Sequence, residues 1–148
     1  MIADLELVRC LAAADHGLAV VATTRTDGSV HGSVVNAGVL DDPITAVPVV
    51  GFVVAGSTLK LRLLRRAGRA TVIFRSGWEW VAVEGPARLI GPDDPTEGFL
   101  VDRLPQLLRD VFTAAGGTHD DWAEFDRVMA AERRAVVLVE PERITTNA

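Results

Sequence analysis

The chain has 148 residues, 49% of them hydrophobic, and a formal net charge of −5 at pH 7. One domain of this length buries a sizeable core, and the single cysteine, Cys10, excludes an intramolecular disulfide and a cysteine-based metal cluster. The apolar runs fall short of the roughly 18 residues needed to span a bilayer, and the acidic balance disfavours nucleic-acid binding. The acidic start is also unlike a signal peptide. We therefore expect a single cytoplasmic domain, residues 1–148, without a membrane or nucleic-acid partner.

The beginning of the chain predicts a helix followed by a hairpin. Apolar residues recur at helical spacing over residues 4–14, and we expect Cys10 to be buried among them. A β-rich stretch at residues 18–24 precedes Asp27-Gly28, which is a strong hairpin signal. A second strand, from residue 30 to about residue 38, should therefore pair with the first.

The middle of the chain predicts a strand, a turn of small residues and a helix. Residues 47–55 form a nearly continuous apolar strand. Good helix formers follow at residues 59–66, with Ser57 or Thr58 as the N-cap and Gly68 as the C-terminal stop.

The remaining pattern completes a mixed fold with more strands than helices. The predicted elements are strands at residues 70–74 and 80–90, helices at 96–114 and 120–132, and a last strand at 135–140 before a polar tail. Hairpins dominate the first half of the chain. We therefore expect a mainly β (α+β) domain, a six-stranded antiparallel barrel with helices packed on its outside.

The charges are unevenly distributed around the predicted helix at residues 59–66. Between Pro43 and Trp78 there is no acidic residue, but there are six basic ones: Lys60, Arg62, Arg65, Arg66, Arg69 and Arg75. The first turn of a helix presents free backbone N–H groups and partial positive charge, so a phosphate or carboxylate would bind there. The alternative is a solvated basic face opposite a leucine stripe of Leu59, Leu63 and Leu64. Charge asymmetry alone does not decide between the two.

Other catalytic motifs are missing from the sequence. Gly56 to Lys60 does not match a phosphate-binding Walker loop, and no serine lies in a nucleophile elbow. His16, His31 and His119 lack metal-ligand spacing, so we expect no metal site. No side chain is nominated as a catalytic acid or base. Trp78 and Trp80 are expected on one face of a strand, either in the core or against a flat aromatic ligand.

The order and spacing of several segments resemble a known family. The segments are Ala22–Gly28, Lys60–Arg66 leading into Gly68–Ala70, Trp80–Leu89, His119–Trp122 and Arg133–Leu138. Together they resemble the pyridoxamine 5'-phosphate oxidase-like split β-barrel family of FMN- and F420-binding oxidoreductases. The last two segments are similar to its actinobacterial branch, which uses the deazaflavin coenzyme F420.

The resemblance implies a homodimer with two cofactor sites at the subunit interface. It places Lys60 at the cofactor phosphate, with Ser57, Thr58, Arg62 and Arg65 around it. It further implies that Ser33, Val35 and Asn36 lie along the ring system, and that Trp78 and Trp80 come from the partner subunit.

The activity implied is that of an F420H2-dependent reductase that passes hydride to a small organic substrate. Relatives often have arginine at the position of Thr58 and a polar residue at that of Leu63. These departures leave FMN as the alternative cofactor of an oxidase or reductase with the same fold. A non-enzymatic cofactor or ligand carrier is the third hypothesis, because no catalytic side chain is visible.

Overall fold

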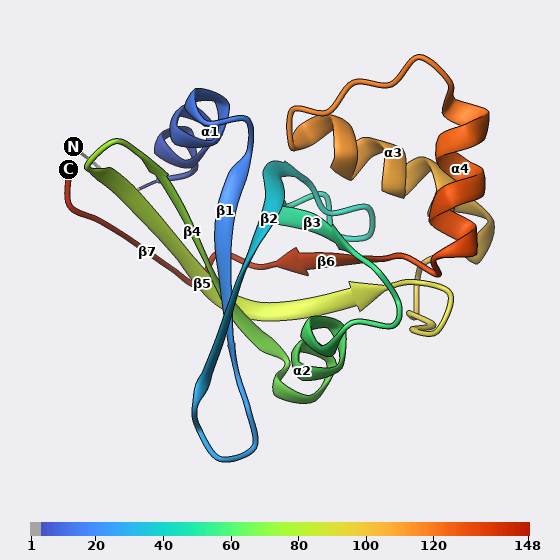
Figure 1. Cartoon of the computed structure of the whole chain (residues 1–148), viewed down its shortest axis with the longest axis horizontal. Coiled ribbons are helices and arrows are strands. Elements are labelled where there is room, and N and C mark those ends of the chain that lie inside the picture. The colour runs from blue at the N-terminus through green and yellow to red at the C-terminus, as the bar shows by residue number, and fades with distance from the viewer. Residues whose placement is uncertain (1–3) are drawn as a thin grey trace.

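The computed structural model describes residues 4–148 (Figure 1). Its helices are α1 (Leu5–Ala14), α2 (Leu59–Ala67), α3 (Leu104–Ala114) and α4 (Trp122–Ala131), with a short 3-10 turn at Val101–Arg103. Its strands are β1 (Leu18–Thr24), β2 (Val30–Asp41), β3 (Pro48–Val54), β4 (Arg69–Ser76), β5 (Glu79–Ile90), β6 (Ala135–Val139) and β7 (Arg143–Thr146). Within these residues, no helix is long and apolar enough to cross a membrane.

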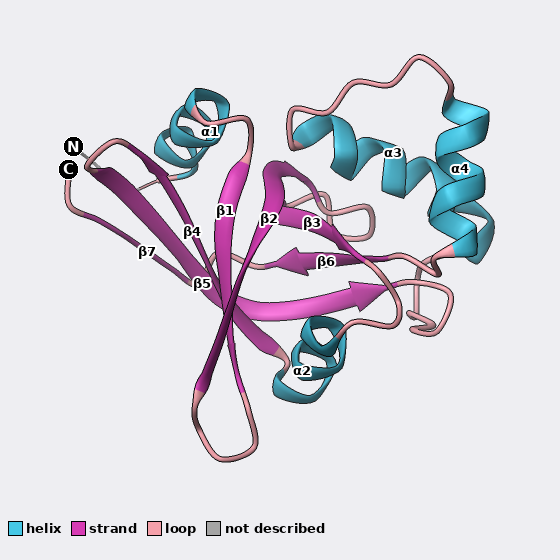
Figure 2. Ribbon diagram, viewed as in Figure 1, coloured by secondary structure: helices cyan, strands magenta, loops and turns pink. Residues whose placement is uncertain are grey.

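Six of the strands close into an antiparallel barrel (Figure 2). The sheet runs β4-β1-β2-β3-β6-β5, and β5 pairs back onto β4. The length of β5 makes this closure possible, because residues 79–86 pair with β4 while residues 87–90 pair with β6. The expected six-stranded barrel with flanking helices is thus confirmed.

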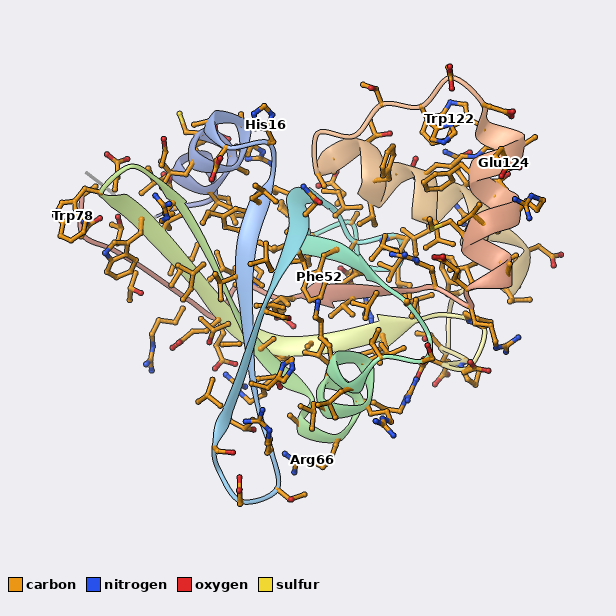
Figure 3. All side chains as sticks on the ribbon, viewed as in Figure 1. His16, Phe52, Arg66, Trp78, Trp122 and Glu124 are labelled. Atoms are coloured by element: carbon orange, nitrogen blue, oxygen red, sulfur yellow. The ribbon has the colours of Figure 1, made fainter. Side chains whose placement is uncertain are left out.

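The barrel interior is filled by side chains that alternate along the strands. Phe52 and Phe74 are fully buried there, and Figure 3 shows Phe52 in the middle of the barrel. α1 and α2 lie near opposite ends of β1 (Figure 1) and add Leu7, Val8, Leu61 and Leu64 to the same core. The apolar face of α2 therefore fixes the helix on the barrel independently of the contacts that its basic side chains make.

A second apolar layer joins α3 and α4 to the outside of the barrel. Leu107, Leu108 and Val111 of α3 and Phe125 of α4 pack against outward side chains of β3 and β6. α3 comes close to β2 at Gly38, where an added Cβ would lie 2.1 Å from the carbonyl oxygen of Ala114. The absence of a side chain at Gly38 therefore allows the end of α3 to pack directly against the backbone of β2.

The structure corrects the expected helix at residues 96–114, which begins only at Leu104. Pro105 explains the difference, since it stands at the first turn of α3, where its missing N–H costs nothing. Inside a longer helix it would break a hydrogen bond. At residue 96, where the helix was expected to begin, the hydroxyl of Thr96 donates to the carbonyls of Leu89 and Asp94.

Two further expectations were wrong. The polar tail contains β7, which pairs with residues 81–84 of β5. The side chains of β7 alternate between exposed and half-buried. In a segment of four residues this alternation is a weak sequence signal for a strand. Cys10 is exposed, because the buried positions of α1 are Leu7, Val8, Leu11 and Ala12. Their helical spacing leaves residue 10 on the solvent side.

Candidate functional site

The turn from β3 into α2 has the geometry of an open helix start. Thr58 is the N-cap: its hydroxyl donates to the carbonyl of Ala55 at 2.9 Å and accepts from the N–H of Leu61 at 3.4 Å. The N–H groups of Leu59 and Lys60 belong to the first turn, where a helix provides no acceptor. The expected N-cap is confirmed, and its hydroxyl is used within the turn.

α2 is amphipathic, but its buried face differs from the expected stripe. Leu61 and Leu64 are buried, Leu63 is half-buried and Leu59 is exposed. This orientation leaves Lys60 half-buried at the margin of the helix. Burial, and then the nearby positive charge of Arg134, lower the pKa of Lys60 below that of an ordinary lysine.

Four of the six basic residues are used in contacts within the chain. Arg65 binds both carboxylate oxygens of Asp94, at 2.7 and 2.9 Å, and Arg69 pairs with Glu142 at 2.7 Å. The guanidiniums of Arg66 and Arg75 donate to the carbonyls of Thr24 and Gly77. The predicted role of Arg65 beside a phosphate therefore competes with a bidentate ion pair.

Lys60 and Arg62 differ from these four. Within residues 4–148, neither side chain makes an ion pair or a hydrogen bond, whereas Arg66 and Arg75, which also lack an acidic partner, are held by backbone carbonyls. Both lie in the first turn of α2, beside its free N–H groups. The two side chains of the basic cluster that make no contact of this kind in the described chain therefore both lie at the start of the helix.

A further cation reaches this region from the distant end of the chain. The N–H of Gly56 donates to the carbonyl of Glu132 at 3.0 Å, and a Cβ at Gly56 would lie 2.6 Å from the carbonyl oxygen of Arg133. The junction of α4 and β6 is therefore pressed against the β3–α2 turn, and Arg134 comes near Lys60. Sequence reasoning did not assign Arg134 to the site, because a contact between residues this far apart has no local signal.

The three candidate residues on β2 do not share one face. Ser33 and Val35, two positions apart, both face the barrel, and Val35 is buried in its core. Asn36 faces outward, and its side-chain amide donates to the carbonyl of His16 at 2.9 Å. Ser33 Oγ and His31 Nδ1 are buried and find no hydrogen-bond partner in the described part of the chain. The placement of Ser33, Val35 and Asn36 along a ring stays a prediction.

The two tryptophans lie at and just after the turn that joins β4 to β5. Trp78 stands in the turn between β4 and β5, with 92% of its surface exposed, and Trp80 is the second residue of β5, at 36% exposure. Trp78 is therefore outside the strand, and neither indole lies in the core. Asn147 fixes the backbone here, accepting from the N–H of Trp80 and donating to the carbonyl of Trp78. Figure 3 shows Trp78 at the far end of the hairpin from Arg66 on α2. Their predicted place in the site therefore requires a second copy of the chain.

A cavity of about 330 Å³ lies between the barrel and the two outer helices. Asn36 of β2 and Val53 of β3 line the barrel side, while Phe112 of α3 and Phe125 of α4 line the helix side. Arg134 also lines it, so the cavity adjoins the region of Lys60. No group of three His, Cys, Asp or Glu side chains in residues 4–148 is placed to hold a metal ion.

Comparisons of the sequence find no relative, whereas comparisons of the structure find many. No protein-family model and no curated protein sequence matches the chain. A protein of unknown function from Agrobacterium tumefaciens superposes with a TM-score of 0.65 at 19% identity, over 98% of this chain. The chain spans 57% of that protein's length.

Other solved structures with the same architecture have described ligands or activities. A pyridoxamine 5'-phosphate oxidase-related, FMN-binding protein from Nostoc punctiforme matches with a TM-score of 0.62 at 15% identity, over 95% of this chain and 79% of that one. An F420 reductase matches with a TM-score of 0.59 at 13% identity, over 89% and 91% of the two chains. A heme-binding protein from Mycobacterium smegmatis also matches, with a TM-score of 0.62 at 18% identity, over 96% of this chain and 52% of that one. At these identities the likeness establishes the fold: the chain is a split β-barrel of the kind found in pyridoxamine 5'-phosphate oxidase-related proteins and an F420 reductase.

Proposed function

We propose that this protein binds the deazaflavin coenzyme F420 and acts as an F420H2-dependent reductase of small organic molecules. The observation that carries the proposal is the pair Lys60 and Arg62, two cations without an acidic partner in residues 4–148 at the open start of α2. The split-barrel fold, which an F420 reductase shares, supports the choice of cofactor.

The residues present fit an anionic cofactor. Lys60 is half-buried beside another cation, so it is poorly solvated and its pKa is lowered. A phosphate at this position replaces lost hydration and offsets the repulsion between Lys60 and Arg134. The N–H groups of the first turn add donors of the kind that phosphates bind. Ser33 Oγ, buried without a partner in the described chain, would gain one from a ligand.

In this proposal the protein binds and orients while the coenzyme supplies hydride chemistry when bound. Lys60 and Arg62 hold the anionic tail at the helix start. The buried side of the β3–α2 turn keeps these cations in a fixed position, because Leu61 and Leu64 anchor α2 in the core.

We further propose that the protein works as a homodimer. The outward faces of β1 and β2 carry exposed apolar side chains, among them Val20 and its cross-strand neighbour Val34, which is 64% exposed. Apolar side chains clustered on one sheet face are typical of a protein interface. Trp78 lies at the far end of the β4–β5 hairpin from Arg66 on α2 (Figure 3), so in this proposal a second copy brings Trp78 and Trp80 to the site.

Fluorescence titration with F420 and FMN, side by side on the same protein, tests the cofactor. Tighter binding of F420, followed by oxidation of F420H2 with an activated alkene panel, is the expected result. Preference for FMN, or yellow protein on purification, would instead support the FMN-dependent alternative. Coenzyme binding without turnover of any panel member would support the non-enzymatic carrier; one structural neighbour of this fold is a heme-binding protein.

A further inference from the structure

The cavity between the barrel and helices α3 and α4 differs from the helix-start site in its mainly apolar lining. It has about 330 Å³ of space, within the lower range of small-molecule pockets. Its lining is mainly apolar, and it contains no Asp or Glu. The residues that matter here are Val53, Phe112, Phe125, Met129 and Arg134.

Aromatic packing gives the helix side of this cavity a defined shape. The rings of Phe112 and Phe125 lie 5.0 Å apart between centroids, and Trp122 stands edge-to-face behind both, at 6.1 and 5.2 Å. Gly117 closes over Phe112, where a Cβ would lie 2.5 Å from the ring. The helix side of the cavity is therefore formed by aromatic rings packed against one another, a surface on which a flat apolar ligand can stack.

One charged side chain lines the cavity, and it is a cation. Arg134 contacts Oε1 of Glu132 through both Nη2, at 2.7 Å, and Nε, at 2.9 Å. Both side chains are partly exposed, so the pair adds little stability, and a ligand carboxylate inside the cavity would have to compete with Glu132. Asn36 and His16 add polar groups to the lining. An apolar cavity that has a cation and no anion in its lining is complementary to an apolar acid.

We propose that this cavity is a binding site for a small aromatic or branched aliphatic carboxylic acid, with its carboxylate on Arg134 and its apolar body between Val53 and the Phe112–Phe125 wall. The role of this acid as the substrate rests on the proposed reductase function. The binding itself does not: Arg134 also lies near Lys60, but neither Lys60 nor Arg62 lines the cavity.

Calorimetric titration of the coenzyme-free protein tests this with two probes of similar size, 2-naphthoate and the uncharged 2-naphthylmethanol. We expect naphthoate to bind at least tenfold more tightly than the alcohol, because a carboxylate gains a charge-assisted hydrogen bond from Arg134. Arg134→Gln should remove that tenfold preference and leave the alcohol's affinity within about threefold. Arg133→Gln is the matched control, since its guanidinium binds Asp93 outside the cavity, and it should change neither affinity.

Val53→Phe provides a second variant, because it fills the cavity without touching a charge. It should abolish binding of both probes while thermal unfolding stays cooperative. Equal affinity for the two probes, equal effects of the Arg133 and Arg134 variants, or unchanged binding in Val53→Phe would each overturn the inference. If F420 binds but naphthoate does not, only this inference fails; if naphthoate binds but F420 does not, only the reductase proposal fails.

Discussion

Replacing Lys60 with alanine is the most informative perturbation of this protein, because Lys60 is half-buried and its ammonium has no acidic partner in residues 4–148. A hydrogen bond to a charged group contributes about 1.5–3 kcal/mol. Losing one such bond to the coenzyme phosphate should therefore weaken binding about 10- to 150-fold. Little of this loss should come from unfolding, since Lys60 is not part of the apolar core.

Arg66→Ala is the control on the same helix. It removes the same charge, but Arg66 is exposed and its guanidinium donates to the carbonyl of Thr24. Six residues of helical rise separate it from Lys60 by about 9 Å, which is comparable to the Debye length at physiological salt. We therefore expect it to weaken coenzyme binding by less than about threefold.

The assay is a titration of coenzyme fluorescence at fixed ionic strength, with thermal unfolding of each variant measured alongside. If Lys60 binds the coenzyme phosphate, Lys60→Ala loses far more coenzyme affinity than Arg66→Ala, while the two variants unfold at similar temperatures. Equal losses would mean that the coenzyme senses only the total charge of α2. An unchanged affinity in Lys60→Ala would place the anion elsewhere.

Four other outcomes are expected. Coenzyme affinity should fall as the pH rises toward the range where an ordinary lysine titrates. The fall should begin below that range, because binding needs protonated Lys60 and burial lowers its pKa. Lys60→Gln, titrated in parallel, should lack this fall. Val34→Asp should convert the dimer to a monomer in light scattering without loss of fold, and a wild-type monomer at working concentration would contradict the interface. Phe52→Ala should cost about 3–5 kcal/mol in denaturant unfolding, because Phe52 is fully buried in the barrel; a loss below 1 kcal/mol would contradict its central packing. Gly38→Ala should destabilise the fold by about 1–3 kcal/mol, because its Cβ would lie 2.1 Å from a backbone oxygen of α3, and wild-type stability would show that α3 can shift freely.

Much of the fold follows from local signals in the sequence. The hairpin at Asp27-Gly28, the capped helix after β3 and the alternating strands appear as expected, because turn chemistry and side-chain periodicity act over a few residues. The start of α3 was predicted too early, at residue 96, although Pro105 favours the first turn of a helix over its interior. β7 was missed, because four residues become a strand only when β5 offers an unpaired edge.

The candidate site shows the same division more sharply. The sequence alone determined that a basic helix with an open first turn follows β3, since its caps and charges are all local. It did not determine which charges remain available to a ligand. Lys60 and Arg65 lie five residues apart on the same helix, but Asp94, 29 positions further along the chain, neutralises only Arg65. Only the tertiary structure places Asp94 against one end of α2 and Arg134 near the other, because ion pairing depends on distances of a few ångströms that chain order does not specify.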